Sequence, residues 1–255
     1  MWITSAELTP ARLLRLLILV GAVVLIVPAA AQASTTSITG SSLVVSAGGE
    51  RNDLFVSQLD GSTVSVSDSG AALDDPLPAA CSRIDTNEAT CDLAGLQSVD
   101  VSLGDGDDTL QIDGSVLAAN VDGGGGADSI TLNGKGGSAS GGEGDDKIAG
   151  SDSADSLAGG IGDDELVGAG GNDTLLGGDG EDLLFGDDGN DTVSGGGAVD
   201  RLDGGEGKNR LDGGAGDDSL NSEAGTDTDL GGEGDDVITG SAFSLNADGG
   251  DGKDT

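Results

Sequence analysis

Aliphatic residues return every nine residues through the second half of the chain. From Gly123 onward, Ile, Leu or Val occupies the eighth place in eleven of fourteen complete nine-residue units. The stretch GGIGDDELVGAGGNDTLLGGDGEDLLF, residues 159–185, contains three such units end to end. The three residues around the aliphatic place suffice for a very short strand with one side chain facing inward. The glycines before it indicate a turn, because glycine readily adopts positive φ.

Residues 34–102 show a different pattern, in which apolar and polar residues alternate. The segments SSLVVSAG, DLFVSQLDG, STVSVSDSG and LQSVDVSL each have a period of two and are bounded by Gly, Asp or Ser. Such segments predict short strands joined by tight turns. We expect a small β-rich segment that caps the repeats, because repeat arrays need atypical terminal segments.

Two turn–strand units bring the chain full circle, so one coil of the predicted solenoid is two nonapeptides long. Coils stacked about 4.8 Å apart place residue n beside residue n+18. The sixth places of the units then fall on two edges. The first edge carries Asp128, Asp146, Asp164, Asp182, Asp200, Asp218, Asp236 and Asp254. The second edge carries Gly137, Asp155, Asp173, Asp191, Asn209, Asp227 and Leu245.

The acidity of the chain gives these columns a chemical meaning. The chain has 47 acidic and 10 basic residues and no histidine. Carboxylates about 5 Å apart repel by roughly 3 kcal/mol at an effective dielectric constant near 20. A divalent cation between successive turns would remove that repulsion, and oxygen-only ligands with flexible geometry favour Ca²⁺ over Mg²⁺. Zinc is disfavoured because its usual His and Cys ligands are missing or scarce.

The same composition excludes several functional classes. The negative charge argues against nucleic acid or anionic membranes as partners. Without histidine, neither a Ser-His-Asp triad nor a zinc-peptidase helix is possible, and no G-x-S-x-G, P-loop or EF-hand motif occurs. The paired carboxylates are better explained as a metal column than as an acid/base pair. We therefore expect no catalytic residues in this chain.

Residues 1–33 have the pattern of a signal peptide. Arg12 and Arg15 precede an apolar run at 16–31, and Ala31-Gln32-Ala33 forms a small-residue cleavage site. An uncleaved anchor is the alternative, although the run is shorter than the roughly 20 residues of a spanning helix. In an exported chain the pair Cys81 and Cys91 predicts a disulfide, with free thiols or a metal pair as alternatives.

The G-G-x-G-x-D-x-U-x pattern is the known signature of calcium-binding β-helix repeats. Residues 103–255 closely resemble the repeats-in-toxin (RTX, hemolysin-type calcium-binding) family. The resemblance implies an all-β fold, a parallel β-roll with several Ca²⁺ ions. It also implies that turn carbonyls and aspartates of successive coils hold each ion. By this resemblance the metal ligands are the eight first-edge aspartates together with Asp155, Asp173, Asp191 and Asp227.

Some units depart from the family pattern. Ala198 stands where a fourth glycine is expected, and Asn209 lacks the charge of aspartate. The unit at 103–111 fits the pattern two residues out of register. A cleavable signal is unusual for family members secreted in one step. Because the sequence stops inside a repeat and exposed strand edges are normally covered, we expect a longer natural chain, with a partner that covers this end as the alternative.

Three domains are expected: a signal peptide at 1–33, a capping segment with a disulfide at 34–102, and a β-roll at 103–255. The predicted function is that of a secreted calcium-binding protein that is disordered without metal and folds on Ca²⁺. Its role would be structural or adhesive, with cell-surface or matrix components as partners. The alternative is an accessory module of an extracellular hydrolase, protease or epimerase whose catalytic domain lies beyond Thr255.

Overall fold

The protein is described by a computed structural model that is built of strands and turns. The described residues are 35–39, 42–47, 51–58, 63–68, 81–83, 88–92, 94–114, 117–223, 226–240 and 246–255. Within these ranges there is no helix, and hence none that could cross a membrane. The expected signal peptide at 1–33 and the turn residue Leu245 lie outside them.

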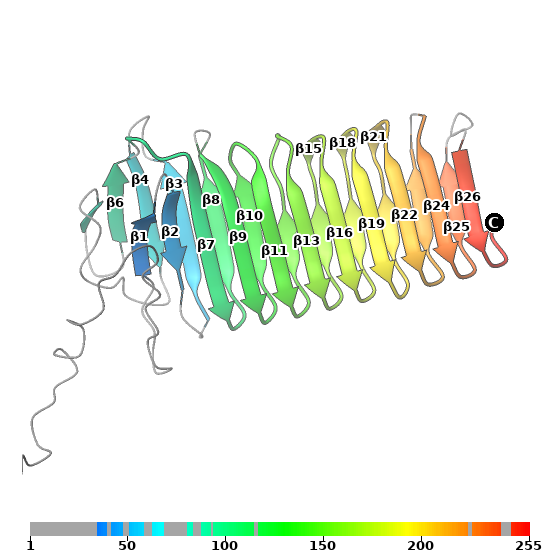
Figure 1. Ribbon diagram of the computed structural model, residues 1–255, viewed down its shortest axis with the longest axis horizontal. Helices are drawn as coiled ribbons and strands as arrows, with labels where there is room; N and C mark the ends of the chain where they lie inside the picture. The colour runs from blue at the N-terminus through cyan, green and yellow to red at the C-terminus, as the bar shows by residue number, and fades with distance from the viewer. Residues whose placement is uncertain are drawn as a thin grey trace, which may run out of the picture. The chain divides into compact units, whose positions relative to one another are not determined.

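One face of the molecule is an eleven-stranded sheet whose strands lie side by side in chain order (Figure 1). Its strands are β1 (Thr35–Thr39), β2 (Ser42–Ser46), β7 (Ser98–Asp105), β9 (Ala118–Gly125), β11 (Gly137–Glu143), β13 (Ser156–Ile161), β16 (Thr174–Asp179), β19 (Thr192–Gly197), β22 (Arg210–Ala215), β24 (Thr228–Glu233) and β26 (Asn246–Asp251). All pairings from β2 onward are parallel.

The opposite face is a twelve-stranded sheet. Its strands, in spatial order, are β25 (Val237–Gly240), β23 (Ser219–Ser222), β20 (Arg201–Asp203), β17 (Leu183–Phe185), β14 (Glu165–Val167), β12 (Lys147–Ala149), β10 (Ser129–Asn133), β8 (Thr109–Asp113), β3 (Asp53–Gln58), β4 (Thr63–Asp68), β6 (Glu88–Asp92) and β5 (Cys81–Arg83). A third sheet of two-residue strands lies along the second edge and consists of β15 (Gly170–Gly171), β18 (Asp188–Gly189) and β21 (Glu206–Gly207).

The strand register confirms the predicted coil length. Leu166 pairs with Leu184 and Leu175 with Val193, so residue n lies beside residue n+18. The first coil is wider, because Gly104 pairs with Gly124 and Thr109 with Ser129, which places residue n beside residue n+20. The two extra residues fall between β8 and β9. The unit at 103–111 is therefore out of register in sequence but in register in space.

The interior consists of the eighth-place aliphatic residues, as the pattern predicts. On the twelve-stranded sheet the buried column is Leu110, Ile130, Ile148, Leu166, Leu184, Leu202 and Leu220. On the facing sheet the column is Ala139, Leu157, Leu175, Val193 and Leu211. Asp229 breaks this second column. It is fully buried, and its Oδ1 accepts a hydrogen bond of 2.7 Å from the Ser222 hydroxyl.

The N-terminal segment extends both sheets of the repeats. Strand β2 pairs in parallel with β7, and β3 with β8, whereas β1, β4, β5 and β6 are antiparallel to their neighbours. The expected domain boundary between residues 102 and 103 falls inside β7, so the division into two domains stays a prediction. The expected disulfide is present and joins Cys81 of β5 to Cys91 of β6.

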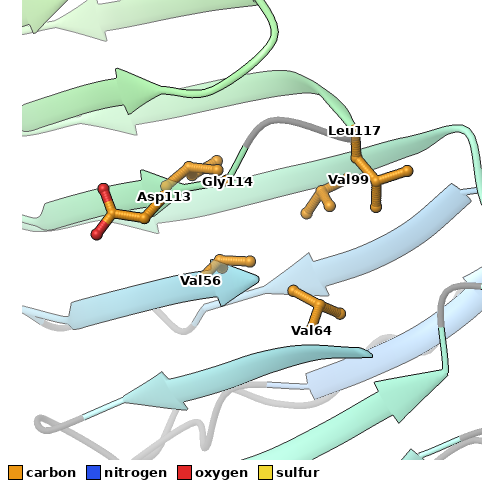
Figure 2. A pocket seen from close by; sticks show the side chains of 7 residues that line it. Val56, Val64, Val99, Asp113, Gly114 and Leu117 are labelled. Carbon is orange, nitrogen blue, oxygen red and sulfur yellow. The ribbon is translucent and has the colours of Figure 1, made fainter. Parts of the chain in front are cut away.

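A small cavity marks the place where this segment meets the repeats. Val56, Val64, Val99 and Leu117 face a common apolar space, whereas the carboxylate of Asp113 points away from it (Figure 2). The cavity lies between the sheets and has no polar cluster at its centre. It therefore reflects imperfect packing at the change from antiparallel to parallel pairing.

Core packing gives the first prediction. Leu184→Ala should lower the free energy of unfolding by about 2–5 kcal/mol, because a fully buried leucine leaves a cavity. Leu176→Ala is the matched control: Leu176 is 47% exposed, so its loss should change stability by no more than about 0.5 kcal/mol. Urea unfolding followed by circular dichroism measures both. Equal effects would mean that the eighth-place residues do not form the core.

Candidate metal-binding edges

The turns on the first edge require glycine for two reasons. Gly160 and Gly162 have φ of 126° and 134°, angles that a side chain disfavours. A Cβ at Gly160 would also lie 2.2 Å from the carbonyl oxygen of Gly142 in the preceding coil. Ala198, the departure noted in the sequence, adopts φ of 73°, which lies in the left-handed region and costs a residue with a side chain some strain.

The sixth-place aspartates before the last coil are buried, and they join successive coils through the backbone. Asp164 is 2% exposed, and its Oδ1 accepts a hydrogen bond of 2.8 Å from the backbone N–H of Asp146. The same bond recurs along the first edge to the last coil. Its acceptors are Asp128, Asp146, Asp164, Asp182, Asp200, Asp218, Asp236 and Asp254. The aspartates of neighbouring coils therefore stack as the period of the sequence predicts.

The second carboxylate oxygen, Oδ2, is buried without a hydrogen-bond donor at most of these positions in the described chain. The first-edge residues with such an atom are Asp108, Asp128, Asp146, Asp164, Asp182, Asp200, Asp218 and Asp236. The second-edge residues are Asp173, Asp191 and Asp227. A buried carboxylate oxygen without a partner is strongly unfavourable, so a repeated row of them fits a site for a positively charged ligand.

Backbone carbonyls face the same space as these oxygens. A Cβ placed on Gly177 would lie 2.2 Å from Asp182 Oδ2 and 2.6 Å from the carbonyl oxygen of Gly195 in the next coil. The arrangement recurs at Gly213, where the corresponding distances to Asp218 Oδ2 and to the Gly231 carbonyl oxygen are 2.4 and 2.6 Å. In these turns a carboxylate oxygen and a carbonyl oxygen of the next coil thus border one small space. Such hard donors suit Ca²⁺.

No cluster of three or more acidic, histidine or cysteine side chains gathers at one point among the described residues. Each coil supplies at most one buried sixth-place carboxylate per edge, so carbonyl oxygens must provide the remaining ligands of any ion. This requirement explains why the turns combine one aspartate with several glycines.

The pKa values of these aspartates reflect their burial. Desolvation raises the pKa of Asp164 and Asp200 to about 7, and the charges of the neighbouring sixth-place aspartates add to the effect. Desolvation likewise raises the pKa of Asp108, Asp128 and Asp173 to about 6. The hydrogen bond to Oδ1 opposes the shift in each case but does not cancel it. Without a cation, the ionised column is therefore unfavourable near neutral pH.

The second edge differs at three turns. At Gly137 there is no side chain, and its N–H donates to Asp155 Oδ1 at 2.6 Å. Asp155 Oδ2 already accepts two hydrogen bonds, from the Ser151 N–H at 2.7 Å and the Ser151 hydroxyl at 2.9 Å. At Asn209 an amide replaces the carboxylate. The inequality of the two edges was visible in the sequence, but the role of Ser151 was not.

Fifth-place residues form a second, exposed row beside the buried one. Asp163 Oδ1 accepts a hydrogen bond of 2.9 Å from the N–H of Glu181, and Asp145 Oδ1 accepts one of 3.0 Å from the N–H of Asp163. These bonds point toward the next coil, whereas the sixth-place bonds point toward the preceding one. Two opposed side-chain bonds therefore tie neighbouring turns together.

Sequence reasoning missed two residues at the start of the first edge. Asp108 is 1% exposed, with Oδ1 bonded to the Asn52 N–H at 2.5 Å and Oδ2 without a donor in the described structure. The motif LGDGDD at 103–108 signalled it, but the two-residue shift hid its place in the column. Asn52, from the alternating segment, caps the column and has no sequence signature.

Comparison with known proteins agrees with this geometry. A family model described as the RTX calcium-binding nonapeptide repeat matches four times, at residues 140–175, 158–193, 167–202 and 194–229. The matches together span residues 140–229, about a third of the chain. No curated protein matches the sequence.

The raised pKa values give the second prediction. A carboxyl group whose folded-state pKa exceeds its ordinary value of 3.8 stabilises the fold when protonated, fully below that value. This stability is lost as the pH rises through about 6 to 7. In chelator, the β signal in circular dichroism should therefore grow as the pH falls from about 8 to about 5.

The control is the same titration in saturating Ca²⁺, where we expect a constant signal because the cation already neutralises the column. A metal-free signal that stays flat or falls on acidification would contradict the assignment of the buried aspartates as the destabilising groups.

Proposed function

We propose that this chain, whose residues 140–229 are RTX calcium-binding nonapeptide repeats, is a calcium-binding protein whose β-roll folds when the ions bind. The observation that carries the proposal is the row of buried Oδ2 atoms, which lie near backbone carbonyl oxygens of the next coil in turns such as those of Asp182 and Asp218. Negative atoms that face each other in a buried cradle need a cation. Calcium supplies that charge when bound and accepts oxygen ligands in flexible number.

Ten of the twelve aspartates expected as ligands have such an unpartnered buried oxygen in the described chain. The remaining two are Asp254, which is exposed in the last coil, and Asp155, whose Oδ2 is bonded to Ser151. Asp108 joins the proposed set on the first edge. The turn glycines contribute carbonyl oxygens, as Gly195 does beside Asp182.

Metal binding and folding are coupled in this proposal. The interior offers aliphatic side chains of modest size, and the chain carries a net charge of −37. Such a chain gains little from burial and is opposed by self-repulsion. The free energy of ion binding therefore supplies folding free energy, as in other metal-dependent domains.

We further infer that the protein is secreted and acts as a structural or adhesive component at a cell surface or in an extracellular matrix. RTX calcium-binding repeats are typical of secreted proteins, and the signal-like residues 1–33 support export. Millimolar extracellular calcium is also the concentration range that weak calcium modules use. The antiparallel strands at the N-terminal end support the proposed capping role of residues 34–102.

We assign no catalytic role to the chain. RTX β-roll repeats are typically structural, and the buried carboxylates here are arranged as a repeating column. The accessory-module alternative, in which the roll serves an extracellular hydrolase, protease or epimerase, concerns sequence beyond Thr255.

A matched pair of variants tests the calcium sites. Asp164→Ala removes a buried carboxylate from the first edge, whereas Asp163→Ala removes the same charge from the exposed fifth place beside it. Asp164→Ala should raise the calcium midpoint by at least about tenfold, because even the loss of an outer-shell partner of a metal ligand costs about that much. Asp163→Ala should stay close to the wild type.

Calorimetric calcium titrations measure the midpoint, and native mass spectrometry counts the bound ions. Equal behaviour of the two variants would contradict the assignment of the buried sixth-place aspartates as ligands.

A further inference from the structure

We propose that Asn209 is a built-in substitute for a cation: its amide closes turn 204–209 by hydrogen bonds and keeps ions out of the gap before it. The inference rests on the proposed calcium function and concerns where along the second edge the ions bind. A gap here means the space between the turns of two successive coils on one edge.

Asn209 occupies the same place in the column as the aspartates. It is 2% exposed, like Asp173 and Asp191. Its Oδ1 accepts a hydrogen bond of 2.8 Å from the Asp191 N–H, and its own N–H donates to Asp227 Oδ1 at 2.7 Å. The asparagine therefore keeps the coil-to-coil stacking intact.

The second terminal atom of Asn209 behaves in the opposite way to that of an aspartate. Its Nδ2 donates to the carbonyl oxygen of Gly204 at 2.8 Å and to that of Gly205 at 3.3 Å. In the turns of Asp173 and Asp191 the atom at this place is Oδ2, which has no donor within the described chain. The amide hydrogens of Asn209 thus bring positive charge to carbonyls that in other turns need it from an ion.

The amide also affects the neighbouring aspartate. A Cβ placed on Gly186 would lie 2.7 Å from Asp191 Oδ2 and 2.7 Å from the Gly204 carbonyl oxygen. That carbonyl is the one to which Asn209 donates. An ion beside Asp191 would share this oxygen with a partly positive N–H group. The gap between turns 186–191 and 204–209 is therefore a poor calcium site, and Asp191, whose Oδ2 borders that gap, is thereby removed from the proposed set of ligands.

The preceding end of the second edge is closed by a different device. Ser151 supplies two hydrogen bonds to Asp155 Oδ2, so turn 150–155 also has its carboxylate satisfied without metal. Between these closed turns, Asp173 Oδ2 and the Gly186 carbonyl oxygen lie 2.5 and 2.8 Å from a Cβ placed on Gly168. Neither Ser151 nor Asn209 donates to these two oxygens.

On the second edge, residues 150–209 thus contain one gap that is expected to bind calcium, between turns 168–173 and 186–191. The turns before and after it, 150–155 and 204–209, are closed by hydrogen bonds. The first edge has no such device, because every sixth place from Asp108 to Asp236 is an aspartate with an unpartnered Oδ2 in the described structure. Ions are therefore expected in an unbroken row on the first edge and singly in this part of the second edge.

The test counts ions. Asn209→Asp should increase the number of Ca²⁺ ions bound at saturation by at least one relative to the wild type, as measured by native mass spectrometry. Asn190→Asp is the matched control, because Asn190 is an exposed fifth-place residue of the same edge and gains the same charge. We expect no additional ion for Asn190→Asp.

The reverse substitution gives an independent readout. Asp173→Asn places an amide in the proposed calcium gap, so the calcium-saturated variant should bind one ion fewer while its β signal is retained. This variant keeps the proposal testable if Asn209→Asp does not fold.

The outcomes separate the two levels of inference. A wild type that binds no Ca²⁺ would overturn the proposed function and this inference together. A wild type that binds Ca²⁺ while Asn209→Asp gains no ion would overturn the role of Asn209 alone. The same gain in Asn190→Asp would also overturn it, because added charge would then suffice. Unchanged stoichiometry in Asp173→Asn would contradict the single gap.

Discussion

The structure depends on one hydrogen bond repeated along each edge. The buried sixth-place carboxylate accepts the backbone N–H of the coil before it, as Asp182 does from Asp164 at 2.9 Å. This bond fixes the register of successive coils, but it uses only Oδ1 and buries the charge. The second oxygen then needs a positive partner. Burial raises the pKa of Asp164 and Asp200 to about 7, because the protein does not replace the water that these carboxylates lose. Coil stacking and the demand for a cation are thus two consequences of a single side-chain placement.

The period of the sequence was enough to predict the coil, the inward aliphatic columns and the two edges. These features repeat, and repetition makes a weak local signal unambiguous. The buried place of Asp108 was not predicted, because the wider first coil shifts the motif relative to the later repeats. Asn52 and Ser151 were also missed: each acts through contacts made by a single residue in a single turn, so no pattern announces it.

The departures from the repeat pattern had different structural outcomes. Ala198 simply adopts the left-handed conformation, and Asp200 beside it remains fully buried with its Oδ2 unpartnered in the described chain. Asn209, in contrast, changes the chemistry of its turn by replacing an acceptor with a donor. Asp229 places a buried carboxylate within the aliphatic column, where Ser222 provides a hydrogen bond. A mismatch in a repeat can therefore be neutral, or it can mark a turn with a different role.

The most direct measurement is a calcium titration of the purified chain from chelator to millimolar Ca²⁺, followed by far-ultraviolet circular dichroism with magnesium as the control ion. The account predicts a weak β signal in chelator at neutral pH, a cooperative rise with Ca²⁺, and no comparable rise with Mg²⁺. A strong β signal in chelator that Ca²⁺ leaves unchanged would contradict the claim that cations hold the buried carboxylate columns together.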